Sequence, residues 1–199
     1  MSSLSQDAGP ITQALLEETI SANFARAVAD HGDREALVDR GNRRRWTYTE
    51  LDRDVEACAL GLVAFGVTKG DRVGIWAPNC PEWVLVQYAT ARLGAILVNI
   101  NPAYRSHELA YVLKQSGMRT IVAVPEFKGS SYADMIDEVR GDCPDLVDVV
   151  LIGEASWDDL MASGASIDPA PLKELESTLS ADDPINIQYT SGTTGFPKG

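Results

Sequence analysis

The sequence has few of the residues that build disulfide or metal sites. Its 199 residues include three cysteines, which lie far apart at Cys58, Cys80 and Cys143. No Cys-x-x-Cys pair occurs, and two histidines are the only imidazole side chains. An odd number of widely spaced cysteines argues against a disulfide framework or a zinc site, and it favours a reducing compartment.

Basic charge and long apolar runs are also scarce. Seventeen Lys and Arg residues stand against 29 Asp and Glu residues, so the net charge is −12. This balance argues against nucleic acid or an anionic membrane surface as a partner. No apolar run approaches the length of a membrane span. Asp7, Glu17 and Glu18 precede the first basic residue, Arg26, so the N-terminus resembles neither a signal nor a transit peptide. Together these features predict a soluble, cytoplasmic protein.

Two common nucleotide-binding motifs are missing. No Gly-x-Gly-x-x-Gly occurs, which removes the main sequence argument for a dinucleotide fold. A Walker A loop has Gly directly before its Lys and Ser or Thr directly after it. Here Pro197 precedes Lys198 and Gly199 follows it.

The last eleven residues, 189–199, nevertheless have the composition of a phosphate-binding loop and read Y-T-S-G-T-T-G-F-P-K-G. Glycines let the backbone approach a ligand closely, and hydroxyl groups donate hydrogen bonds to anionic oxygens. Successive backbone N–H groups can form an anion-binding nest, to which a lysine adds a positive charge. The predicted phosphate-binding residues are Thr190, Ser191, Gly192, Thr193, Thr194, Gly195 and Lys198. The alternative is a surface turn, which does not normally combine so many hydroxyls with a Pro-Lys-Gly.

Strand-like and helix-like patterns alternate through the middle of the chain. Short buried strands are expected at 72–76, 95–99, 120–124 and 147–152, and a half-buried strand at 185–189 leads into the loop. Helical spacing of apolar residues is expected after Thr49, from Asn79 to about Gly94, from Ser106 to Gly117, and over 132–139. This alternation predicts an α/β fold, with a mostly parallel sheet that carries helices on both faces.

Several helix boundaries follow from local signals. Thr49 is expected to cap the first of these helices, which Gly66 ends. Asn79, with Glu82 three residues later, resembles a capping box for the next helix. Residues 162–184 are rich in Ala, Ser, Asp and Pro, and we expect a connecting segment with one short helix over 172–179.

Two groups of residues allow more than one interpretation. Arg40, Arg43, Arg44 and Arg45 surround Gly41-Asn42, which favours a hairpin tip with solvated arginines over a patch for a phosphate-rich ligand. Trp76, Trp83 and Tyr88 could line an acyl pocket, but aromatic residues beside a buried strand are more often part of the core.

The terminal run T-S-G-T-T-G-x-P-K-G resembles the signature loop of the AMP-forming acyl-CoA synthetases and their adenylate-forming relatives. Upstream segments extend the resemblance: T-Y-T-E-L at 47–51, D-R-V-G-I at 71–75, N-C-P-E-W at 79–83, and N-P-A-Y with E-L at 101–109. Together they cover most of the chain from Thr47 to Gly199. The loop is highly specific for the family, and the other segments are supportive.

The resemblance implies a two-step ligation. A carboxylic acid, of which a fatty acid is favoured by the N-P-A-Y-R stretch, attacks ATP and releases pyrophosphate. The acyl-adenylate then reacts with the thiol of coenzyme A, and Mg²⁺ accompanies the nucleotide. Residues 1–199 would form the N-terminal part of the large AMP-binding domain, ending at the phosphate loop. The remainder of that domain and a C-terminal domain would carry the catalytic residues beyond Gly199, so the chain alone is expected to be inactive.

Two functions from other classes remain open at this point. A P-loop-type kinase or NTPase would need a helix after the loop and cleavage between the β- and γ-phosphates. A non-catalytic nucleotide-binding remnant would need the native reading frame to end at Gly199. Continuation of the reading frame would favour the ligase.

Overall fold

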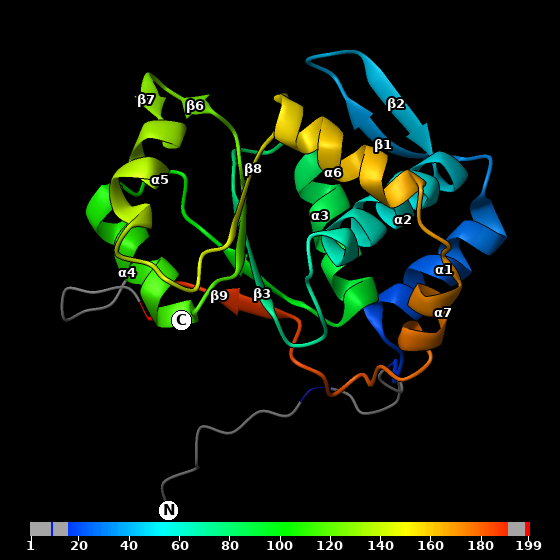
Figure 1. Cartoon of the computed structure of the whole chain (residues 1–199). Coiled ribbons are helices and arrows are strands. Elements are labelled where there is room, and N and C mark those ends of the chain that lie inside the picture. The colour runs from blue at the N-terminus through cyan, green and yellow to red at the C-terminus, as the bar shows by residue number, and fades with distance from the viewer. Residues whose placement is uncertain (1–8, 10–15, 191–197) are drawn as a thin grey trace, which may run out of the picture.

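A five-stranded parallel sheet forms the centre of the protein (Figure 1). The computed structural model describes residue 9, residues 16–190 and residues 198–199. The sheet has the order β8-β5-β3-β4-β9. Its strands are β3 (Arg72–Trp76), β4 (Ile96–Asn99), β5 (Thr120–Ala123), β8 (Asp148–Leu151) and β9 (Asn186–Gln188). All four neighbouring pairs are parallel, which confirms the predicted α/β class.

Helices cover both faces of this sheet, as expected (Figure 1). On one side of the sheet lie α1 (Ile20–His31), α2 (Tyr48–Ala64), α3 (Pro81–Leu93), α6 (Ala155–Ala165) and α7 (Ala170–Glu176), which share one hydrophobic core with this face. The other face packs against α4 (Ser106–Ser116) and α5 (Tyr132–Arg140). Side chains alternate between the faces along each strand. In β3, Val73 and Ile75 therefore belong to the first core, whereas Trp76 belongs to the second.

Two small antiparallel hairpins flank this sheet: β1 (Glu35–Asp39) with β2 (Arg44–Thr47), and β6 (Glu126–Phe127) with β7 (Ser130–Ser131). The first confirms the predicted hairpin around Gly41-Asn42. Two of its four arginines are ion-paired, because Arg44 bonds Glu82 at 2.8 Å and Arg45 bonds Glu35. The Arg44 guanidinium also lies 4.5 Å from the centre of the Trp46 ring. These contacts favour the hairpin interpretation over a phosphate patch.

Two predicted helix caps are wrong. Helix α2 begins after Thr47, not Thr49, because Thr47 and Glu50 form a reciprocal capping box. Helix α3 begins after Cys80 with Pro81 in its first turn, and no side chain caps it. The carboxylate of Glu82, which the capping-box prediction assigned to the helix start, instead accepts from Arg44. A partner distant in sequence thus replaced the local one.

Helix α6 was not predicted as a helix, and its last four residues fall in the expected connecting segment. The helix contains few large apolar residues, and its buried residues are Trp157, Leu160 and Gly164. Helix α6 crosses α2 at two glycines, Gly164 of α6 and Gly61 of α2, so small residues rather than large apolar ones form this contact. A Cβ atom on Gly164 would overlap the carbonyl oxygen of Ala57, and one on Gly61 would overlap that of Leu160. The helices can approach this closely only because both positions lack a side chain.

A buried arginine ties three helices together. Arg92 of α3, whose side chain is 9% exposed, bonds Glu176 of α7 at 2.8 Å and Asp52 and Glu56 of α2 at 3.3 Å. Burial raises the pKa of Asp52, and Arg92 partly opposes that rise. Because three carboxylates share one guanidinium, removing Arg92 would leave uncompensated negative charge between α2 and α7.

The close crossing of α2 and α6 leads to a stability prediction. Replacing Gly164 by Ala should lower the free energy of unfolding by about 2–3 kcal/mol, because the added methyl group overpacks the backbone contact. Chemical unfolding followed by circular dichroism measures this. Gly141→Ala is the control, since no atom lies within 4 Å of its added Cβ, and it should change stability by less than about 0.5 kcal/mol. If Gly164→Ala and Gly141→Ala were equally stable, the close backbone contact between α2 and α6 would be contradicted.

Candidate functional site

The carboxyl ends of all five parallel strands lie at one edge of the sheet. The chain passes from β3 to β4 on one side of β3 and from β5 to β8 on the other. In open α/β sheets, ligands bind outside the carboxyl ends of the strands, at the place where the strand order reverses. The segments that follow β3, β4, β5 and β9 are therefore the first places to look for a site.

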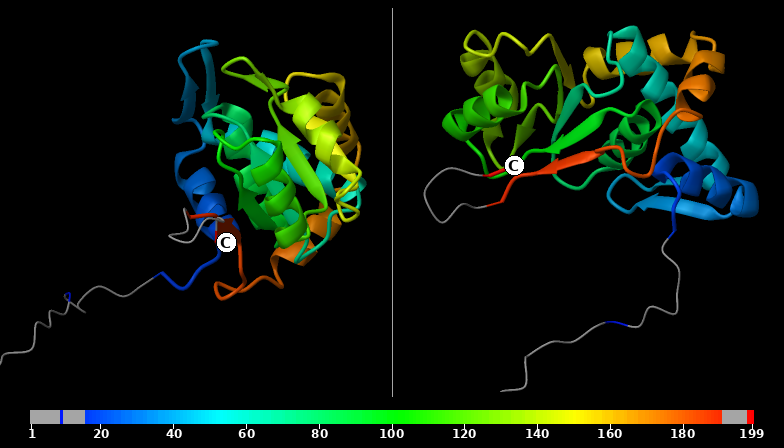
Figure 2. Two further views of the ribbon diagram at one scale, coloured as in Figure 1. Left: turned by 90° about the vertical axis from the view of Figure 1, so that its left-hand side faces the viewer. Right: turned by 90° about the horizontal axis from the view of Figure 1, so that it is seen from below.

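Strand β9 delivers the predicted phosphate loop to this edge. In the right-hand view of Figure 2, β9 lies at the margin of the sheet and the chain continues beyond it toward Thr190. Thr190 and Lys198 pair as an antiparallel bridge, with reciprocal backbone hydrogen bonds of 2.9 and 3.1 Å. The structure thus brings together two of the seven predicted site residues. The other five, Ser191, Gly192, Thr193, Thr194 and Gly195, lie outside the described residues.

Aromatic side chains surround the base of the loop. Tyr189, Ile187, Tyr104 and Tyr111 are all partly buried and pack against the second core. Burial raises the pKa of the Tyr189 hydroxyl, and the nearby phenols of Tyr111 and Tyr104 raise it further. The base of the loop is therefore anchored in the side of the sheet that α4 covers.

The turn between β4 and α4 is held by two stacked aromatic rings. Trp76 and Tyr132 lie parallel with ring centres 3.6 Å apart. Trp76 Nε1 donates to the carbonyl oxygen of Asn101 at 3.1 Å, and the Tyr132 hydroxyl donates to that of Pro102 at 2.6 Å. Trp76 is fully buried, which confirms that it belongs to the core. Tyr88 stacks on Phe24 with ring centres 4.4 Å apart, and Trp83 packs against the first core.

A cationic cleft of about 400 Å³ opens beside this turn, and sequence reasoning missed it. Its lining residues are Asn101, Pro102, Ala103, Arg105, Phe127, Lys128 and Ser130. Arg105 donates to the Ser130 hydroxyl, and the ammonium of Lys128 lies 5.3 Å from the centre of the Phe127 ring. Lys128 and Gly129 both have positive φ in the two-residue turn of the β6–β7 hairpin. Two exposed cations in a chain of net charge −12 suit an anionic ligand.

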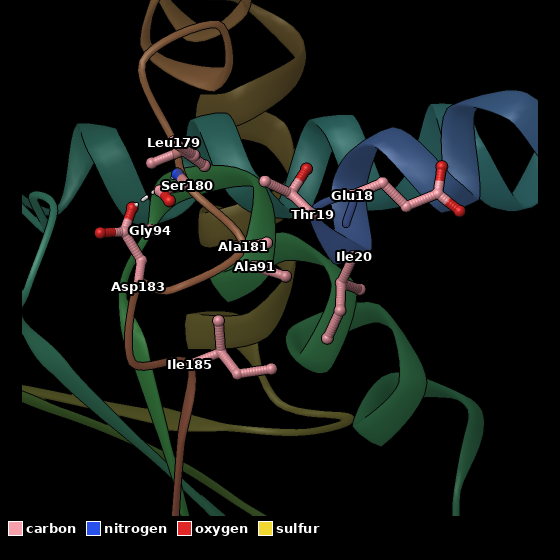
Figure 3. Close-up of a pocket in the computed structure, with 10 residues that line it drawn as sticks. All are labelled: Glu18, Thr19, Ile20, Ala91, Gly94, Leu179, Ser180, Ala181, Asp183 and Ile185. Atoms are coloured by element: carbon pink, nitrogen blue, oxygen red, sulfur yellow. Dashed lines mark hydrogen bonds between the residues drawn. The ribbon is translucent and has the colours of Figure 1, made fainter. Parts of the chain in front are cut away.

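A second pocket lies away from this edge. It is formed by the start of α1, the end of α3 and the connection from α7 to β9 (Figure 3). Its volume of about 80 Å³ accommodates only a few waters. Both of its carboxylates are paired, Glu18 with Arg26 at 2.6 Å and Asp183 with Lys69 at 2.8 Å. Because Gly94 and Ile185 precede β4 and β9, the pocket lies at the amino ends of these strands.

The three thiols are poor nucleophile candidates. Burial raises the pKa of Cys58 to about 12 and that of Cys80 to about 11, and it raises that of Cys143 as well. At neutral pH all three are therefore protonated. In the described part of the chain, no group of three or more His, Cys, Asp or Glu side chains could hold a metal ion. The same residues include no helix that is long and apolar enough to cross a membrane.

Known proteins with similar sequences are acyl-CoA ligases. Residues 24–199 match the family model described as AMP-binding enzyme. The chain is 36% identical to the putative acyl-CoA synthetase YngI of Bacillus subtilis, over 93% of this chain and 37% of that protein. It is 40% identical to the human mitochondrial medium-chain acyl-CoA ligase ACSF2, over 84% of this chain and 30% of that protein. The chain thus spans about a third of the length of these relatives.

Solved structures agree with this assignment. The inhibitor-bound N-terminal domain of FACL13 from Mycobacterium tuberculosis superposes with a TM-score of 0.77 at 28% identity, over 92% of this chain and 44% of that one. A fatty acyl CoA synthetase of the same organism gives a TM-score of 0.76 at 30% identity, over 91% and 34%. The chain belongs to the AMP-binding enzyme family, within which it matches the N-terminal portion of the AMP-forming acyl-CoA synthetases.

Proposed function

We propose that the protein is an AMP-forming acid–thiol ligase. It would join a carboxylic acid to ATP, release pyrophosphate, and transfer the acyl group from the adenylate to the thiol of coenzyme A. The observation that carries the proposal is the Thr190–Lys198 bridge, which closes the phosphate-loop sequence at the carboxyl edge of the sheet. The acyl-CoA ligase names of the relatives support it, and they do not favour a kinase, an NTPase or a non-catalytic remnant.

The loop is proposed to hold the β- and γ-phosphates of ATP. Hydroxyls of Thr190, Ser191, Thr193 and Thr194 would donate to the phosphate oxygens, and Gly192 and Gly195 would allow close approach. Lys198 would stabilise the charge that develops on the departing pyrophosphate. The bridge holds the backbones of Thr190 and Lys198 side by side, and Thr190 Oγ1 donates to the Lys198 carbonyl oxygen at 3.3 Å, a bond that it would exchange for one to phosphate.

The cationic cleft is proposed to bind the phosphate-bearing end of coenzyme A. Arg105 and Lys128 supply charge, Ser130 supplies a hydroxyl, and Phe127 supplies an aromatic surface. The cleft follows β4 and β5 at the same edge of the sheet at which Thr190 and Lys198 pair. A nucleotide-containing thiol could therefore reach an adenylate formed beside the loop.

The remaining assignments are also proposals. A fatty acid is the favoured acyl substrate, which is supported by the names of the medium-chain acyl-CoA ligase and fatty acyl CoA synthetase relatives. Mg²⁺ would accompany the ATP phosphates, and no described residue is assigned to it. Residues 1–199 would form the N-terminal part of the large domain, and the catalytic residues would lie outside them. The cytoplasm remains the proposed location, on the basis of the cysteine usage.

The reaction class can be tested by isotope exchange. At the length of its relatives, the protein should exchange labelled pyrophosphate into ATP only when a carboxylic acid is present, because adenylation is reversible. A series of fatty acids of increasing chain length would define the preferred substrate. Acid-independent release of inorganic phosphate without AMP would contradict the ligase and favour a kinase or NTPase.

The role of the loop predicts a difference between the two half-reactions. Lys198→Ala and Thr193→Ala should slow adenylation by about 10²-fold or more, as expected when a charge-stabilising donor is lost. Thiol transfer from preformed acyl-adenylate should change much less, because the outer phosphates have left by then. Rapid-quench measurement of each half-reaction gives both rates. Equal losses of rate in adenylation and thiol transfer would contradict a role of the loop that is specific to adenylation.

The cleft predicts a selective loss of coenzyme A binding. Arg105→Ala combined with Lys128→Ala should raise the KM for coenzyme A by about tenfold, because two charge-assisted contacts are lost. The KM for ATP should change by less than about twofold. Lys114→Ala is a matched control, since this exposed lysine of α4 lies outside the cleft. A parallel rise in both KM values would exclude the cleft as a coenzyme A site.

A further inference from the structure

The glycine that ends the loop sequence is in contact with an aromatic ring. A Cβ atom on Gly199 would lie 2.8 Å from Cζ of Tyr189 and 3.0 Å from Cγ2 of Ile187. Carbon atoms at van der Waals contact are about 3.5–4.0 Å apart. A side chain at position 199 therefore fits only if the Tyr189 ring moves.

The strand register explains why these two residues meet. Thr190 lies opposite Lys198 in an antiparallel bridge, so Tyr189 lies opposite Gly199. Directly opposite residues project from the same face, and successive residues project from opposite faces. The Tyr189 ring therefore covers Gly199 on one face, while Thr190 and Lys198 project from the other. An aromatic ring laid over a cross-strand glycine shields the backbone that the glycine leaves bare.

The Tyr189 ring also has support on the side of α4. Tyr104 and Tyr111 pack into the same cluster as Tyr189 and Ile187. Burial raises the pKa of Tyr189, in agreement with a phenol withdrawn from solvent. The ring is thus held between the helix side of the core and the returning strand.

We propose that Tyr189 is a positioning residue, whose ring seats on Gly199 and fixes both strands at the base of the phosphate loop. By fixing these strands, it sets the backbone placement of Thr190 and Lys198 without contacting the nucleotide. The inference rests on the proposed function, because this placement affects catalysis only if the two residues bind the ATP phosphates. When groups that position a substrate are displaced by about 1 Å, the reaction rate can fall about 10²-fold.

Enzyme kinetics on four variants test the pair. Gly199→Ala should raise the KM for ATP about tenfold and lower the rate of pyrophosphate exchange, whereas the KM for the carboxylic acid should stay within about twofold. Tyr189→Phe keeps the ring and should retain activity, whereas Tyr189→Ala should raise the KM for ATP about tenfold and leave measurable activity. In the double variant Gly199→Ala/Tyr189→Ala the clash with the ring is gone and only the 3.0 Å approach to Cγ2 of Ile187 remains, so the glycine change should cause a much smaller further loss. Equal losses from Gly199→Ala in both backgrounds would overturn the proposal.

Amide hydrogen exchange provides a readout that does not depend on catalysis. The amides of Thr190 and Lys198 donate to each other's carbonyls, so both should exchange faster in Gly199→Ala and in Tyr189→Ala. Gly141→Ala, whose added Cβ meets no atom within 4 Å, should leave them unchanged. Unchanged exchange in the Tyr189 and Gly199 variants would refute the positioning role. An unaltered protein without acid-dependent pyrophosphate exchange would refute the ligase function instead, and amide exchange would still decide the role of Tyr189.

Discussion

The placement of Thr190, the first residue of the proposed phosphate loop, depends on the parallel pairing of β9 with β4. Only three residue pairs form this contact: Leu97 with Asn186, Val98 with Ile187, and Asn99 with Gln188. They place Ile187 on the side of the sheet that α4 covers, and Tyr189 follows on the same side. A slip of one residue would move both side chains to the opposite face. The register of β9 thus determines which face of the loop base is anchored in the core and which face is free to meet a ligand.

Ion pairs secure the connection that leads into this short edge strand. Arg92 of α3 holds Glu176 at the end of α7, and Lys69 holds Asp183 just before β9. Asp183 also accepts a hydrogen bond from the backbone of Ser180. The exposed Lys69 pair contributes little stability by itself. The buried Arg92 cluster is different, because its carboxylates would repel one another without the guanidinium. The chain therefore reaches β9 from two fixed points, although its edge strand has only one neighbour among the described residues.

Local signals were sufficient to predict most of the framework from the sequence. The strands are short, apolar and separated by helical patterns, and Gly94 and Gly117 end α3 and α4 in the left-handed conformation that glycine favours. Local reasoning failed where a distant partner decided the outcome. Glu82 bonds Arg44 rather than the start of α3, and α6 owes its burial to a backbone contact between glycines.

The candidate site also has one part that is local in sequence and one part that depends on distant residues. The predicted phosphate loop is contiguous in sequence, so its chemistry can be proposed from residue types alone. The cationic cleft is not, because Arg105 and Lys128 belong to loops that follow different strands. Tyr189 and Gly199 are ten positions apart, and the adjacent Thr190–Lys198 bridge and the close approach of the Tyr189 ring to Gly199 show that they face each other. Neither the cationic cleft nor the contact between Tyr189 and Gly199 could be recognised without the folded structure.

The stacked pair of Trp76 and Tyr132 has a consequence for the entropy of ligand binding. Both rings direct their polar groups at successive carbonyl oxygens, of Asn101 and Pro102, so one wall of the cationic cleft is fixed by the core itself. A binding wall that is already ordered loses little conformational freedom when a ligand arrives. The loss falls mainly on the exposed side chains of Arg105 and Lys128, which cost about 0.5–1.5 kcal/mol each when immobilised. The cleft therefore combines a rigid aromatic support with two exposed charges, and most of the entropic cost of a ligand bound there would fall on those two side chains.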